Sequence, residues 1–278
     1  MARTVQDVAY LLTAMAGTDA QDPATAQADL HHRDYAASLD AGSLRGTRIG
    51  VARFICGGWD KAVQDKFEDA LDRMRNAGAV LIEIGEFGGD LDAIGNKEFK
   101  VLLCELKDGL AAYLAEAAPA VEARSLAQVI DFNTRTADKE MPFFGQEHFL
   151  EADKTDGMKS EGYREARDSS QRAAGPEGID RLLREHNVQA LVAPTMSAPW
   201  TIDVVNGDHF GGAASTLPAV AGYPHLTVPM GQVHGLPVGV SFMGPAWSDA
   251  WLLSLGFSFE VHCPPRPMPR FATTLPEV

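Results

Sequence analysis

The hydrophobic pattern is clearest between residues 190 and 244, where three short apolar runs are each closed by a proline or a glycine. The runs occupy residues 190–194, 226–229 and 238–242. Runs of this length are typical of buried strands in an α/β sheet. A long polar loop separates the first two runs. Because α/β proteins bind ligands in loops at strand ends, we expect this loop to contact a substrate.

Earlier in the chain, the pattern predicts a strand–helix–strand unit. Residues 46–53 and 80–84 are short apolar runs, and residues 59–77 between them place apolar side chains at helical spacing. A helix that crosses between two neighbouring strands makes them parallel. We therefore expect a parallel strand pair here.

Helical spacing recurs in several other segments. Thr4 is a suitable cap for a helix over 4–16 with Asp7 three residues later, and Ser248 for one over 249–262. We expect Gly175-Pro176 to break the chain before a helix at 179–186. Further helices are predicted at 99–117, 126–138, 163–172 and 213–221, followed by an extended proline-rich tail from Pro264.

Composition and charge narrow the class of protein. A chain of 278 residues can form one large α/β domain or two smaller ones. The net charge of −14 argues against a nucleic-acid or acidic-membrane surface, which needs an excess of cations. The chain holds no long apolar run of transmembrane type, and its first residues lack the apolar core of a signal peptide. The expected location is cytoplasmic.

The metal-binding residue types are scattered rather than clustered. The three cysteines, Cys56, Cys104 and Cys263, lie far apart, which fits free thiols better than a zinc site or a disulfide framework. His31 and His32 are adjacent and point apart on a helix, so we expect an exposed pair. No metal site and no cofactor is predicted.

The familiar catalytic motifs are not found in the sequence. It contains no G-x-S-x-G, S-x-x-K, H-E-x-x-H, P-loop or G-x-G-x-x-G pattern. Ser197, Ser215 and Ser241 lie near strand ends or in the small-residue run, but the sequence shows no base for any of them. The last lysine is Lys159, so the 190–244 stretch supplies none.

Four stretches, in this order along the chain, resemble the amidase signature family. Two further segments, at 200–210 and 132–147, are similar to the branch that includes peptide amidases. The four stretches are ARTVQDVAYLLTAMAGTDAQDPAT at 2–25, GTRIGVAR at 46–53, GPEGIDRLLREHNVQALVAPT at 175–195 and AVAGYPHLTVPMGQVHGLPVGVSFMG at 219–244; the two further segments are WTIDVVNGDHF and FNTRTADKEMPFFGQE.

The resemblance implies an α/β fold with a mixed, largely parallel sheet surrounded by helices, of which residues 1–278 form a single domain, incomplete relative to the family fold. It also implies amide hydrolysis by a serine, with a second serine and a neutral lysine as the base and glycine N–H groups around the oxyanion. The family places all three catalytic residues in a Gly/Ser-rich half that has no match here. No catalytic residue is therefore assigned, and only a pocket-lining role is carried over, to Thr195, Trp200, Asp203 and Asn206.

These observations leave three candidate functions, of which the first two are the main ones. The chain is the C-terminal part of a serine amidase, acting on a small-molecule or peptide amide when the other half completes it and inactive alone. Alternatively, it is a stand-alone binding or assembly module on the same scaffold, or an independent hydrolase with a new Ser or Asp. Strands and an N-terminal helix without their neighbours also favour self-association.

Overall fold

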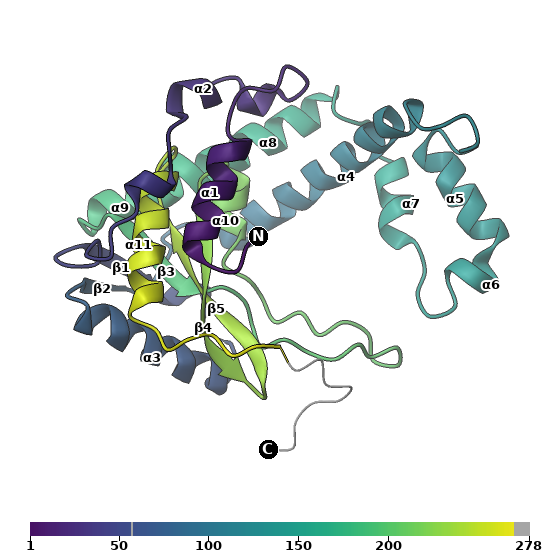
Figure 1. Cartoon of the computed structure of the whole chain (residues 1–278). Coiled ribbons are helices and arrows are strands. Elements are labelled where there is room, and N and C mark those ends of the chain that lie inside the picture. Colours follow the sequence, from purple (N-terminus) through teal and green to yellow (C-terminus); the bar gives the residue numbers. More distant parts are fainter. Residues whose placement is uncertain (57, 270–278) are drawn as a thin grey trace. The chain divides into compact units, whose positions relative to one another are not determined.

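The computed structural model describes residues 1–56 and 58–269, which form two compact units (Figure 1). The first unit contains residues 1–88, 174–201 and the described residues from 209 onward. The second contains residues 89–173 and 202–208. The first unit carries the sheet.

The sheet of the first unit has five strands in the order β2-β1-β3-β5-β4. β1 pairs in parallel with β2 and β3, whereas β5 pairs antiparallel with β3 and β4. The predicted mixed α/β sheet is confirmed. The strands are β1 (Arg48–Ala52), β2 (Val80–Ile84), β3 (Ala190–Pro194), β4 (His225–Val233) and β5 (Leu236–Met243).

The predicted strand–helix–strand unit is also confirmed. A short turn, η3 (Arg53–Ile55), follows β1, and α3 (Lys61–Asn76) then leads to β2. The helix begins after Asp60, whose carboxylate accepts a hydrogen bond from the Ala62 N–H. One apolar stripe of α3 is buried in the core of the unit: Val63, Phe67, Ala70, Leu71 and Met74.

The first and last helices of the unit pack against each other. α11 (Asp249–Val261) contributes Leu252, Leu255 and Phe259 to the same core as α3, and α1 (Val5–Met15) packs on α11. Thr4 caps α1 as predicted, accepting from the Asp7 N–H at 3.0 Å. The Val5 N–H donates to both carboxylate oxygens of Glu260, at 3.0 and 3.3 Å. The last helix therefore supplies the packing surface and the negative charge that the start of α1 needs.

The predicted break at Gly175-Pro176 is wrong. Residues Gly175–Ile179 form a π-helical turn, η4, that leads directly into α9 (Asp180–Glu185). Ala174 before the turn is already helical, so Pro176 lies inside helical chain, where it has no N–H to donate to the preceding turn. The widened π-helical turn accommodates the proline at this position. Gly175 is close to the Tyr223 ring, since a Cβ there would lie 3.2 Å from its hydroxyl oxygen. The wider turn thus fits Tyr223, which follows α10 (Thr216–Ala221), against the helix.

The remaining segments of the first unit are short. Between α1 and β1 lie η1 (Pro23–Thr25), α2 (Ala28–His31) and η2 (Ala36–Ser38). The tail predicted to be extended has no helix or strand at 264–269, and its remainder lies outside the described residues.

The second unit is helical in the residues described. Tyr163 in α8 donates its hydroxyl proton to Glu105 in α4 at 2.7 Å, and the Asp108 carboxylate in α4 accepts from the Met158 N–H, also at 2.7 Å. The Asp90 side chain caps α4, which explains why this helix begins before the predicted residue 99. The helices are α4 (Leu91–Ala115), α5 (Leu126–Arg135), α6 (Ala137–Glu140), α7 (Glu147–Asp153) and α8 (Glu161–Ala174).

Candidate functional site

A surface cleft of about 420 Å3 lies in the first unit where β3 ends and β5 passes. Thr195 follows β3 directly, and its N–H donates to the Gly239 carbonyl on β5 at 2.7 Å. The cleft therefore sits on the sheet itself. Its walls are mostly apolar with two hydroxyls, a composition that suits a small organic ligand with few polar groups. The lining residues are Thr195, Met196, Ser197, Pro199, Trp200, Pro237, Val238 and Gly239.

The structure brings two of the four predicted pocket residues, Thr195 and Trp200, together in this cleft. The Trp200 ring packs edge to face with Phe210, with 6.4 Å between ring centroids and 70° between planes. This contact orients the indole, because an aromatic pair prefers such a T-shaped geometry.

The other two predicted pocket residues, Asp203 and Asn206, contact each other. One Asp203 carboxylate oxygen accepts from the backbone N–H groups of Val205 and Asn206, both at 2.9 Å, and the other accepts from the Asn206 side-chain amide at 2.7 Å. These donors, the Asn206 backbone first, lower the pKa of Asp203. Both residues belong to the 202–208 segment of the second unit.

A chain of hydrogen bonds runs from Thr195 into the sheet. The buried Ser241 hydroxyl on β5 donates to Thr195 Oγ1 at 3.0 Å, and His225 Nε2 on β4 lies 2.6 Å from Ser241 Oγ. Thr195 Oγ1 is also 2.6 Å from the hydroxyl of Thr227, an exposed residue on β4. Burial lowers the pKa of His225, which favours the neutral imidazole. The Thr195 hydroxyl of the cleft is therefore held by hydrogen bonds with Ser241 and Thr227.

Sequence reasoning missed the pairing of Ser241 with a histidine. In the β4–β5 ladder Thr227 lies opposite Ser241 and His225 opposite Met243, so His225 is a diagonal neighbour of Ser241. The short His234-Gly235 turn between the strands could have indicated this register, but a bulge between Pro229 and Gly231 shifts it along the way. Counting back from the turn would therefore have been wrong by one residue.

The Ser241–His225 contact does not make a catalytic pair that a ligand can reach. Ser241 is 0% exposed, and its proton is directed to Thr195. Ser197 in the cleft accepts from the Gly211 N–H at 3.2 Å, and Ser215 precedes α10 without a side-chain cap bond. This cleft can hold and orient a ligand, whereas covalent catalysis needs an accessible nucleophile with a base beside it.

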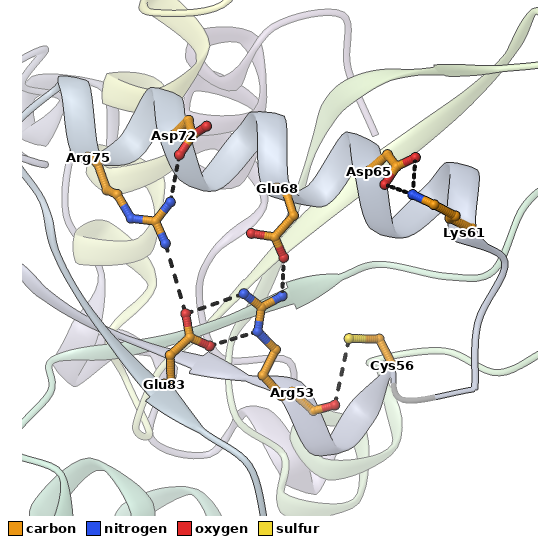
Figure 2. Close-up of polar contacts among 8 residues, drawn as sticks. All are labelled: Arg53, Cys56, Lys61, Asp65, Glu68, Asp72, Arg75 and Glu83. Atoms are coloured by element: carbon orange, nitrogen blue, oxygen red, sulfur yellow. Dashed lines mark hydrogen bonds and ion pairs between the residues drawn. The ribbon is translucent and has the colours of Figure 1, made fainter.

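A second polar cluster follows the carboxyl end of β1 (Figure 2). Arg53 in η3 donates to Glu68 in α3 and to both carboxylate oxygens of Glu83 in β2, at 2.7 and 3.3 Å. Arg75 lies 3.9 Å from the same Glu83. Burial alone would lower the pKa of Arg53, but its hydrogen bonds to Glu83 and Glu68 outweigh this effect and raise the pKa. Each charge in the cluster has a partner within the fold, which indicates that the cluster joins η3, α3 and β2.

Among the described residues, no group of three or more His, Cys, Asp or Glu side chains is placed to hold a metal ion. His31 corrects the expectation of an exposed histidine pair, because its partly buried ring stacks on Trp247 with 3.9 Å between centroids and 6° between planes. Within residues 1–56 and 58–269, no helix is long and apolar enough to cross a membrane.

Comparison with known proteins identifies the family. The model of the amidase family matches residues 1–253. A probable amidase of Arabidopsis thaliana is 30% identical over 273 residues, an alignment that covers 97% of this chain and 49% of the plant protein. A glutamyl-tRNA(Gln) amidotransferase subunit of Acinetobacter baylyi is 28% identical over 94% of this chain and 53% of its own length. The peptide amidase of Stenotrophomonas maltophilia has a solved structure that matches with a TM-score of 0.84 and 41% identity, over 98% of this chain and 54% of that chain.

The chain therefore belongs to the amidase family, whose members are the amidase signature enzymes. It spans about half the length of the curated relatives that it matches.

Proposed function

We propose that this chain is the C-terminal part of a serine amidase and that it supplies the binding side of an amide-hydrolysing site. In this proposal, the Lys/Ser/Ser set comes from a Gly/Ser-rich half that these 278 residues do not include, and the chain is inactive alone. The observation that carries the proposal is the cleft at the end of β3, which combines apolar walls and the Thr195 hydroxyl in a chain that spans about half the length of the relatives it matches.

The lining of the cleft supports the proposed division of labour, because it contains no lysine. Lys61 and Lys66 pair with aspartates one helical turn away in α3, and Lys107 donates to the backbone carbonyls of Asp153 and Thr155. In the proposal, the lysine and the two serines of the family mechanism come from the other half.

The proposed ligand is a small-molecule or peptide amide held in the cleft by Thr195 and Trp200. The pocket-lining role of Asp203 and Asn206 stays a prediction from the sequence. The flat Trp200 ring suits an apolar or aromatic group beside the amide, because such a contact buries area at little cost in conformational entropy. The Thr195 hydroxyl is suited to form a hydrogen bond with the polar amide group of the ligand. Carboxamide-acting relatives are consistent with this class, since one solved neighbour is a peptide amidase.

A binding experiment tests the proposed role of the cleft. The purified chain is titrated with N-acetyl-L-phenylalaninamide, and the affinity is compared with that of the Trp200→Ala variant. We expect the variant to bind about tenfold more weakly, since it loses an aromatic contact. Trp247→Ala, which removes the ring stacked on His31, is the matched control and should bind as the wild type does. Equal affinity for wild type and Trp200→Ala would contradict the assignment.

The alternative function is a non-catalytic binding or assembly module on the amidase scaffold. This alternative is favoured by the cleft's lack of an accessible nucleophile with a base beside it. The two proposals differ in whether the other half restores hydrolysis. A cytoplasmic location, self-association and the organisation of the chain as a single incomplete domain stay predictions from the sequence.

A further inference from the structure

We propose that Thr195 donates its hydroxyl proton to the carbonyl oxygen of the bound amide, and that Ser241 and His225 are positioning residues that keep Thr195 ready to donate. The inference rests on the proposed amide-binding role of the cleft. It adds which atom of the ligand is recognised and which residues below the surface control that contact.

The directions of these hydrogen bonds follow from the buried Ser241 hydroxyl. Ser241 is fully buried, and its hydroxyl donates to Thr195 Oγ1. A hydroxyl has one proton, so Ser241 cannot also donate to His225. His225 Nε2, 2.6 Å from Ser241 Oγ, must therefore carry a proton and donate it. The neutral imidazole is thus fixed as the Nε2–H tautomer.

The same reasoning continues at Thr195. Its hydroxyl has one proton and two lone pairs, and Ser241 occupies one lone pair. Thr227 lies 2.6 Å away and can either accept the Thr195 proton or donate its own. When Thr227 donates, both lone pairs of Thr195 are occupied and its proton is the group that remains for the cleft.

An amide ligand selects this second arrangement. A neutral amide carbonyl is a strong acceptor, and a partly enclosed one that found no donor would be penalised. Thr227 is exposed, so water can complete its hydrogen bonds in either orientation. Rotating the Thr227 hydroxyl therefore costs little, whereas the buried Ser241 and the half-buried His225 stay fixed.

The strand carries a feature that makes room for the hydroxyl pair. Gly239 on β5 lies beside it, and a Cβ at this position would be 2.6 Å from Thr227 Oγ1 and 2.9 Å from Thr195 Oγ1. Both distances are shorter than a carbon and an oxygen tolerate without displacement. A glycine in the middle of a strand often marks such a close approach.

The first test concerns the hydrogen-bond chain alone and needs no ligand. Long-range 1H–15N NMR spectra of the ligand-free chain at neutral pH report which ring nitrogen of His225 carries the proton. We expect the Nε2–H tautomer in the wild type and in the Ser254→Ala control, which breaks a different buried hydroxyl pair, Ser43–Ser254. An Nδ1–H tautomer in the wild type would overturn the inference.

The second test is an affinity series with N-acetyl-L-phenylalaninamide. We expect Thr195→Val, Ser241→Ala and His225→Leu each to weaken binding by about threefold to tenfold, the effect of one hydrogen bond. Thr195→Ser keeps the hydroxyl and His225→Gln keeps a donor near the Nε2 position, so both should retain most of the affinity. Ser254→Ala corrects for any loss of affinity that comes from lower stability.

The outcomes separate the inference from the proposed function. If the wild type binds the amide and the Thr195→Val, Ser241→Ala and His225→Leu variants bind it equally well, the positioning role is wrong and the amide-binding role stands. If the wild type binds no amide, both are wrong. Loss of affinity in those three variants, with retention in Thr195→Ser and His225→Gln, supports both, because a purely structural defect would not be rescued by donor chemistry.

Discussion

At the scale of single residues, the polar chemistry of the cleft depends on groups that lie below its surface. Thr195 was expected to line a pocket by resemblance, but its partners Ser241 and His225 come from a β-hairpin register that the sequence alone does not fix. The resemblance predicts a pocket role for Thr195, whereas strand pairing decides which residues support its hydroxyl. Asp203 and Asn206, predicted with Thr195, hydrogen-bond to each other, and their pocket role stays a prediction.

His225 should make stability depend on pH in a defined direction. Its pKa is lowered by burial below the ordinary value of 6.5. A depressed pKa means that the stabilisation is present above the unfolded-state pKa and is lost as the pH falls through the folded-state pKa. We expect the urea midpoint of the wild type to fall more between neutral pH and about pH 5 than that of His225→Gln, since the glutamine does not titrate. Equal shifts in the two proteins would contradict the assignment.

Gly239 tests the hydroxyl pair by added volume. Gly239→Ala places a methyl group 2.6 Å from Thr227 Oγ1, so Thr195 and Thr227 must separate. We expect weaker amide binding and a loss of about 1–3 kcal/mol in the free energy of unfolding, the usual cost of overpacking. Isothermal titration and urea unfolding measure the two effects. Gly85→Ala, where a Cβ meets no atom within 4 Å, should change neither, and an unchanged affinity in Gly239→Ala would count against the pair.

At the scale of elements, the sequence predicted most helices and strands of the first unit. The bounds of β2 and β3 agree with the apolar runs, because short apolar runs closed by Pro or Gly leave little alternative. β4 extends beyond the predicted 226–229, since a bulge lets pairing resume after Pro229. The π-helical turn at Gly175–Ile179 could not be predicted, because its contact with Tyr223 joins residues far apart along the chain.

The start of α1 depends on a residue that the helical pattern does not reveal. The Glu260 carboxylate on α11 accepts from the Val5 N–H and lies at the positive end of the α1 dipole. We expect Glu260→Gln to lower the free energy of unfolding by about 0.5–1 kcal/mol, as a charge-assisted bond becomes a neutral one. Urea unfolding measures the change. Glu86→Gln, at an exposed loop position, is the control, and a Glu260→Gln protein as stable as this control would show that the contact contributes nothing.

At the scale of the whole molecule, apolar side chains remain exposed in both units. On α1 they include Tyr10 at 58% and Met15 at 72%, and in the second unit Phe143 at 65% and Phe144 at 77%. β2 and β4 form the edges of the described sheet. Exposed apolar side chains and unpaired strand edges both favour association. The sequence predicted this tendency from an apolar helix close to Met1, although not that α11 would cover part of it.

Self-association is therefore expected of the purified chain. Sedimentation velocity should show dimers or larger species whose fraction rises with protein concentration. Replacing Tyr10 with Ser and Met15 with Glu should reduce that fraction, because the changes remove exposed apolar area without touching the buried Val5 and Ala9. A wild type that remains a monomer with a cooperative, high melting transition would contradict the expectation.

The central claim is that this chain binds the amide while another half supplies the chemistry. The most direct measurement is ammonia release from N-acetyl-L-phenylalaninamide, by the purified chain alone and after co-expression with a Gly/Ser-rich, lysine-containing half encoded upstream at its own locus. We expect no release by the chain alone and hydrolysis by the pair, abolished when the serine or the lysine of the upstream half is replaced. Hydrolysis by the chain alone, or a pair that forms but releases no ammonia, would contradict this claim.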